Sequence, residues 1–183
     1  TTTELNLADF FRTNKMKYEA VTYEQNSEVR PSYLSGRCDV YTTDASGLAA
    51  TRSTFPNPNN HMILPEIISK EPLGPATRQG DDNWADIIRW VYNATVTAEE
   101  KGITSANVNS MKTANDPEIL RLLGVEGSQG AELGLSKDWA YQIIKQVGNY
   151  GEIFERNIGI NTDIGLARGL NDLWTRGGLQ YSP

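Results

Sequence analysis

The segment 36–44 constrains the fold of this chain more than any other part of the sequence. Its centre, residues 38–42, is rich in β-branched and aromatic residues, which is typical of a short strand. Asp44 follows, and the small residues 45–52 then predict a helix with Asp44 at its N-cap. A strand that ends at a carboxylate and leads into a helix is a building unit of α/β domains.

The neighbouring segments alternate in the same way. Thr1 and Glu4 have the spacing of a capping box, and the apolar residues after them predict a helix. Residues 17–23 form a strand candidate, and residues 26–35 a helix that tolerates Pro31 only in its first turns. The alternation predicts a parallel sheet with flanking helices and a ligand site at the carboxyl ends of its strands, where Asp44 lies.

The sequence pattern changes after residue 66, from alternating helices and strands to mainly helices. Residues 55–60 predict a loop and residues 61–64 a strand, and three prolines with a glycine then mark 67–78 as an extended connector between two lobes. Residues 1–66 are therefore assigned to an α/β lobe, and residues 79–183 to a mainly helical portion. The expected helices of that portion span 81–101, 105–113, 116–123, 136–147, 149–157 and 166–177.

Composition excludes several functional classes. The 17 basic and 23 acidic residues give a net charge of −6, which argues against nucleic acid and anionic membranes as partners. The apolar runs are too short to cross a bilayer, and His61 is the only histidine, so we expect no metal site and no cofactor. Because no initial Met or charged-then-apolar leader is present, we expect any secretion signal to have been removed or to lie outside this sequence.

Two helix starts carry the candidate binding residues. The hydroxyls and N–H groups of Thr1, Thr2 and Thr3 suit a carboxylate, because a helix N-terminus is partially positive. Asp44 suits an ammonium group. On spacing alone, both starts are more simply explained as helix caps, and a carboxylate can also cap and bind at once. Weaker candidates are Thr43, Ser69, Lys70 and Glu71.

Five strings then resemble one family in the right order. They are TTTELNLADFFR, GRCDVYTTDASGLAATR, ILPEIISKEPLGPATRQGDDNW, VGNYGEIFERNIG and LARGLNDLWTRGGLQY. They are similar to the general L-amino-acid-binding proteins of polar amino-acid ABC transporters, periplasmic receptors with two α/β lobes of the type II fold. The resemblance implies capture of a free L-amino acid and delivery to an inner-membrane permease, without catalysis.

The resemblance also assigns roles to single residues. Thr2 matches the position whose backbone N–H holds the ligand carboxylate, and Thr1 and Thr3 flank it. Asp44 matches the aspartate that accepts the ligand's α-ammonium group. In the family, most of the first lobe and the opening strand of the second precede Thr1, together with a carboxylate-binding arginine and a cysteine partner for Cys38. We therefore expect a fragment, or a chain completed by an N-terminal segment or a second chain.

Two other classes of function remain open. The first is an enzyme on the same scaffold, such as a cyclohexadienyl dehydratase or a hydrolase with Asp39 and Asp44 as paired carboxylates. Strand parity places these two residues on opposite faces, and the sequence has no Ser-His-Asp order, metal cluster or phosphate loop. The second is an amino-acid sensor or interaction domain. Residues 105–135 look like an insertion relative to shorter receptors and receive no function.

Overall fold

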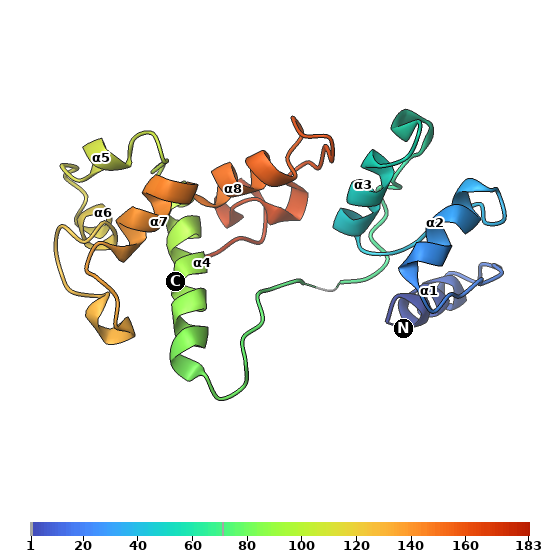
Figure 1. Cartoon of the computed structure of the whole chain (residues 1–183), viewed down its shortest axis with the longest axis horizontal. Coiled ribbons are helices and arrows are strands. Elements are labelled where there is room, and N and C mark those ends of the chain that lie inside the picture. Colours follow the sequence, from blue (N-terminus) through green and yellow to red (C-terminus); the bar gives the residue numbers. More distant parts are fainter. Residues whose placement is uncertain (1, 71) are drawn as a thin grey trace. The chain divides into compact units, whose positions relative to one another are not determined.

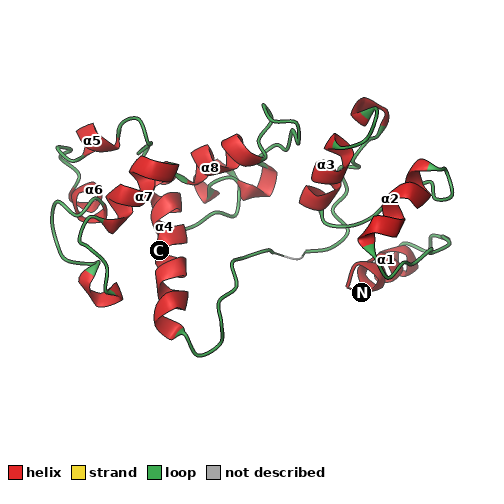
Figure 2. Cartoon of the chain, viewed as in Figure 1, coloured by secondary structure: helices red, strands yellow, loops and turns green. Residues whose placement is uncertain are grey.

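A computed structural model describes residues 2–70 and 72–183 of the chain. The chain divides into two compact units, Thr1–Leu73 and Gly74–Pro183, each of which is described by itself (Figure 1). The boundary falls inside the expected connector, while the assignment of each unit to a lobe stays a prediction. Within the described residues the regular structure consists of helices and no strand is formed (Figure 2).

The helices of the first unit lie where the sequence predicted them. Helix α1 spans Thr2–Thr13, α2 spans Asn26–Leu34 and contains Pro31, and α3 spans Ala45–Ser53. A 3₁₀ turn, η1, covers Pro58–Asn60. At the start of α2 the backbone N–H of Gln25 donates to the Glu28 carboxylate at 3.3 Å, so this helix start is fixed locally.

The expected strands are not formed in this unit. Residues 17–23, 38–42 and 61–64 have no sheet pairing, although all three segments lie in the described ranges. A strand exists only when a neighbouring backbone accepts and donates its hydrogen bonds, and these segments pair with no other described segment. The parallel sheet expected for this lobe is therefore not confirmed. The one β-bridge among described residues joins Leu173 and Gln180 in the other unit.

An aromatic cluster, rather than a sheet, holds the first unit together. The rings of Tyr33 and Phe55 stack with centroids 5.8 Å apart, and the ring of His61 lies 4.8 Å from Phe55. The Tyr33 hydroxyl lies 2.9 Å from Nδ1 of His61. His61, expected at a strand edge, is thus part of this cluster. Many other apolar side chains of the unit are exposed: Leu5, Met16, Tyr18, Val21, Leu34, Val40, Met62, Leu64, Ile67 and Leu73.

The second unit has a compact helical core. Its helices are α4 (Asp82–Glu100), α5 (Val108–Met111), α6 (Pro117–Leu122), α7 (Trp139–Val147) and α8 (Tyr150–Asn157), with the 3₁₀ turn η2 at Ala131–Leu133. These confirm the predicted helices at shorter lengths. The buried core consists of Ala98, Ile103, Val108, Ile119, Leu123, Tyr141 and Ile144. Three of these belong to the segment 105–135, so the apparent insertion supplies part of the core.

The helix expected over 166–177 is wrong. Two 3₁₀ turns, η3 (Gly169–Asn171) and η4 (Trp174–Arg176), replace it. Leu173 is buried between them and pairs with Gln180, so the chain must double back. Gly177 has a φ of +87°, and a Cβ at Gly178 would lie 1.8 Å from the carbonyl oxygen of Asp172. This tight return turn therefore requires glycines, which a helix disfavours.

Candidate functional site

Asp44 stands at the start of α3 with a carboxylate that has no partner among the described residues. It occupies the N-cap position, but its side chain makes no capping hydrogen bond. Only its backbone carbonyl takes part, accepting the N–H of Leu48 at 2.8 Å. The expectation that the carboxylate caps the helix is therefore not met. An exposed carboxylate beside a helix start can accept hydrogen bonds from an ammonium group.

Thr43 precedes Asp44, and its methyl group lies close to the first turn of α3. Its Cγ2 would lie 3.5 Å from a Cβ placed on Gly47, an ordinary packing distance. The roles of Asp44 and Thr43 in ligand binding stay predictions.

The second candidate group is the start of α1. Thr2 and Thr3 are its first residues, with Thr2 exposed and Thr3 partly buried. Thr1 lies outside the described residues, so the expected capping box with Glu4 cannot be placed. The early N–H groups of a helix have no intrahelical acceptor, which makes this start suitable for a carboxylate.

The structure does not join the two helix starts by a polar contact. No hydrogen bond or ion pair among residues 2–70 links Thr2 or Thr3 to Asp44. Ser69 is partly buried and Lys70 is exposed in the extended segment after His61. Glu71 lies outside the described residues.

The argument from strand parity against Asp39 and Asp44 as paired catalytic carboxylates does not apply to this structure. It required a strand over 38–42, and the structure forms none there. Asp39 and Asp44 are both exposed, and no contact joins their carboxylates in the described part of the chain. Shared protons need carboxylates in close contact, so the geometry offers no acid–base pair.

Sequence reasoning missed the contacts that position α3. Arg30 of α2 hydrogen-bonds the Thr54 hydroxyl at the end of α3, and its guanidinium lies 5.9 Å from the Phe55 ring centroid. Tyr33 of α2 stacks on the same ring. Together these contacts attach the carboxyl end of α3 to α2, and its other end presents Asp44. The sequence contains no local signal that Arg30 would meet the aromatic cluster of Tyr33, Phe55 and His61.

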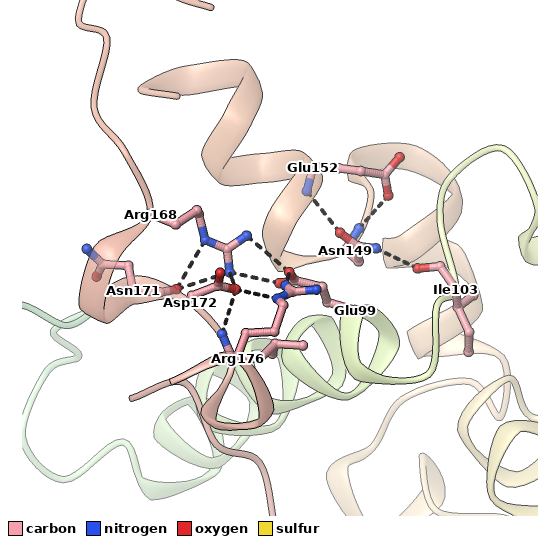
Figure 3. A network of polar contacts seen from close by, with 9 residues as sticks. Glu99, Ile103, Asn149, Glu152, Arg168, Asn171, Asp172 and Arg176 are labelled. Carbon is pink, nitrogen blue, oxygen red and sulfur yellow. Dashed lines mark hydrogen bonds and ion pairs between the residues drawn. The ribbon is translucent and has the colours of Figure 1, made fainter. Parts of the chain in front are cut away.

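The second unit contains a dense polar network that the sequence did not reveal (Figure 3). The guanidinium of Arg168 donates to both carboxylate oxygens of Glu99 at 3.1 Å, and Arg176 donates to Glu99 and Asp172. Burial alone would raise the pKa of Asp172, but hydrogen bonds from Arg176 and from the Leu173 N–H, together with the charges of Arg176 and Arg168, outweigh that effect and lower the pKa. The charges compensate one another, so we interpret this network as structural.

A metal centre finds no support in the described ranges 2–70 and 72–183. No group of three or more His, Cys, Asp or Glu side chains there could hold an ion. Cys38 is a free thiol, 3.8 Å from the Ser32 hydroxyl. None of the helices described is both long and apolar enough to span a membrane.

Comparison with curated proteins matches the whole chain. The chain is 60% identical over 185 residues to the general L-amino acid-binding periplasmic protein AapJ of Rhizobium johnstonii. It is 56% identical to the glutamate/glutamine/aspartate/asparagine-binding protein BztA of Rhodobacter capsulatus and 51% identical to the putative amino-acid ABC transporter-binding protein YhdW of Escherichia coli. Each match covers 100% of this chain and 54% of the relative, so the chain spans about half their length. No family model matches.

A solved structure agrees with these relatives. It is an ABC transporter periplasmic binding protein from Brucella ovis with glutathione bound, 58% identical to this chain, with a TM-score of 0.93. The match covers 100% of this chain and 58% of that protein. The similarity to periplasmic binding proteins therefore extends over the whole length of the chain. The chain is similar to about half of these periplasmic amino-acid-binding proteins of ABC transporters.

Proposed function

We propose that the chain is part of the substrate-binding component of an ABC importer. This component captures free L-amino acids in the periplasm with broad specificity and delivers them to an inner-membrane permease. The observation that carries the proposal is the 60% identity, over the whole chain, to a protein named for general L-amino acid binding. The proposed role is binding and release, without catalysis.

The contacts to the ligand follow from the two helix starts. The Asp44 carboxylate accepts hydrogen bonds from the α-ammonium group. This carboxylate is available because it makes no capping bond to α3. The first N–H groups of α1, at Thr2 and Thr3, donate to the α-carboxylate, with Thr1 beside them. Hydrogen bonds to charged groups contribute roughly 1.5–3 kcal/mol each. These groups are common to all amino acids, so specificity is broad.

Glutathione is a second candidate ligand, because the solved relative from Brucella ovis has it bound. Its γ-linked glutamyl residue keeps a free α-ammonium group and a free α-carboxylate. The same Asp44 and α1 contacts would therefore hold it, while the rest of the tripeptide requires a roomy side-chain pocket. An α-linked peptide separates the two charged groups and would not fit both contacts.

The first unit is proposed to be one α/β lobe of a type II binding fold. Its extended segments 17–23, 38–42 and 61–64 are unpaired, and apolar side chains on them, such as Val40 and Met62, are exposed. A complementary extended segment, supplied by an N-terminal part of the receptor or by a second chain, would pair these backbones and cover that apolar surface.

The proposal is tested by calorimetric titration of this chain with L-Glu, L-Gln, L-Leu, L-Arg and glutathione. Asp44→Ala is compared with Asp39→Ala, a matched change at another exposed aspartate of the same unit. Micromolar binding of several ligands that is lost in Asp44→Ala and retained in Asp39→Ala supports the proposal. Binding that survives Asp44→Ala would contradict the assigned ammonium contact. A measured turnover of any of these ligands would favour an enzyme instead.

A further inference from the structure

Helix α4 has two halves with different surroundings. In its second half, Ala94, Thr95, Val96 and Ala98 are buried in the core. In its first half, residues 82–91, none is buried, and the side chains of Trp84 and Trp90 are 49% and 44% exposed. One continuous helix thus runs from an exposed end into the centre of the second unit.

The C-terminal segment, defined here as residues 166–183, lies against the second half of α4. The Thr97 hydroxyl donates to the Ser182 hydroxyl at 2.9 Å, and the Trp174 indole N–H donates to Glu100 at 2.9 Å. Among the polar contacts between α4 and the C-terminal segment in the described part of the chain, the one nearest the start of α4 joins the Tyr92 hydroxyl to the Gln180 side chain.

Tyr92 lies where the half of α4 that packs against the core and the C-terminal segment begins. Its ring lies edge-on to Tyr150 of α8, with centroids 5.8 Å apart. Burial raises the pKa of Tyr92, and Tyr150 raises it further, so the hydroxyl keeps its proton at neutral pH. An open groove of about 350 Å³ lies along the first half of α4 and is also lined by Pro75 and Thr77 of the connector.

We propose that the contact between Tyr92 and Gln180 is a clamp that sets where the anchored part of α4 ends. The first half of α4 then moves with the connector as a lever, and the second half stays with the core. In the receptor proposed above, where the connector joins two lobes, lobe movement would enter the second unit through this lever. The clamp itself requires no ligand.

Hydrogen exchange of the complete chain, followed by mass spectrometry, tests the proposal. Amides of residues 86–91 should exchange at least about ten-fold faster than those of 96–100, because no residue of the first half is fully buried. Gln180→Leu removes the clamp and should speed the exchange of amides 92–95 about five-fold, as expected for one hydrogen bond. Tyr92→Phe should do the same while it keeps the ring. Ser182→Ala, which removes a contact further along α4, should leave amides 92–95 unchanged.

Two results would overturn the proposal. Equal protection of the two halves of α4 would refute the lever. Exchange of amides 92–95 that is unaltered in both Gln180→Leu and Tyr92→Phe, or accelerated to the same degree throughout the unit, would refute the clamp. Because exchange is measured without an amino acid, failure of the receptor function in calorimetry leaves this test intact, and the reverse also holds.

Discussion

Glu99 and Arg168 form a two-pronged ion pair in which both carboxylate oxygens lie 3.1 Å from guanidinium nitrogens. Their side chains are only 8% and 13% exposed. The Arg168 guanidinium also lies 5.2 Å from the ring centroids of Tyr150 and Phe154. The pair therefore joins α4, α8 and the C-terminal segment at one point, and it explains why that segment follows a fixed course without forming a long helix.

Removing Glu99 should strongly destabilise the second unit. Glu99→Ala leaves the buried Arg168 with only the longer ion pair to Asp172, at 3.5 Å, and breaking such buried pairs costs about 3–5 kcal/mol. The matched control is Arg176→Ala, whose side chain is 51% exposed and should cost about 1 kcal/mol or less. Urea unfolding measures both free energies. Equal losses in the two variants would show that the pair with Arg168 has no special weight.

Gly151→Ala should also destabilise the unit, although alanine normally stabilises a helix interior. A Cβ at Gly151 would lie 2.9 Å from the Glu99 carboxylate and 3.0 Å from Arg168, so the ion pair would have to shift. Gly47→Ala in α3 meets only ordinary contacts and should be stabilising by up to about 1 kcal/mol. Thermal unfolding of both variants tests the contrast. A more stable Gly151→Ala variant would contradict the close approach.

Substitutions of Asn149 should separate the stability contributed by its helix cap on α8 from that contributed by its hydrogen bond to Ile103. Its side chain accepts the Glu152 N–H at 2.9 Å and donates to the carbonyl of Ile103 at 2.7 Å. Asn149→Ala loses the cap and leaves a buried carbonyl unpaired, which should cost about 2–4 kcal/mol. Asn149→Ser keeps a capping oxygen and loses the amide donor, so urea unfolding should show a smaller loss. Equal losses would mean that the cap contributes little.

The Glu152 carboxylate should make stability fall in acid. Burial alone would raise its pKa, but hydrogen bonds from Ser105 and from the Asn149 N–H lower it below the ordinary value of 4.5. Its stabilising contribution is therefore complete above pH 4.5 and is lost as the pH falls through the lower folded-state pKa. Glu152→Gln should flatten this part of the stability–pH curve, and the exposed Glu155→Gln should not. An unchanged curve in Glu152→Gln would exclude the linkage.

Asp44→Ala in a binding-competent receptor should weaken every amino acid by a similar factor, because the carboxylate contacts the shared ammonium group. Thr2→Pro should weaken all ligands as well, since it removes an N–H at the start of α1. Calorimetry with several amino acids measures both series. Loss of one ligand alone after Asp44→Ala would instead identify Asp44 as a side-chain contact. Unchanged affinity in Thr2→Pro would exclude the carboxylate contact.

The helices and the resemblance to these receptors could be predicted because their signals are local. Asp81 caps α4 by accepting the Trp84 N–H at 3.2 Å, and Asp116 caps α6 by accepting the Glu118 N–H at 2.9 Å. Such bonds join residues two or three apart, so the sequence displays both partners. The candidate binding residues were predicted in the same way, from helix starts and from motif matches, and their role awaits the experiments above.

The sequence by itself indicated where most of the helices lie and which receptors the chain resembles. Only the tertiary structure decided that residues 166–177 form no helix, that residues 105–135 supply core, and that Glu99, Arg168 and Arg176 meet. The physical reason is sequence distance: Glu99 and Arg168 lie 69 residues apart, and Tyr92 and Gln180 lie 88 apart. Contacts of that kind override local helix propensity, because they depend on packing of the whole unit.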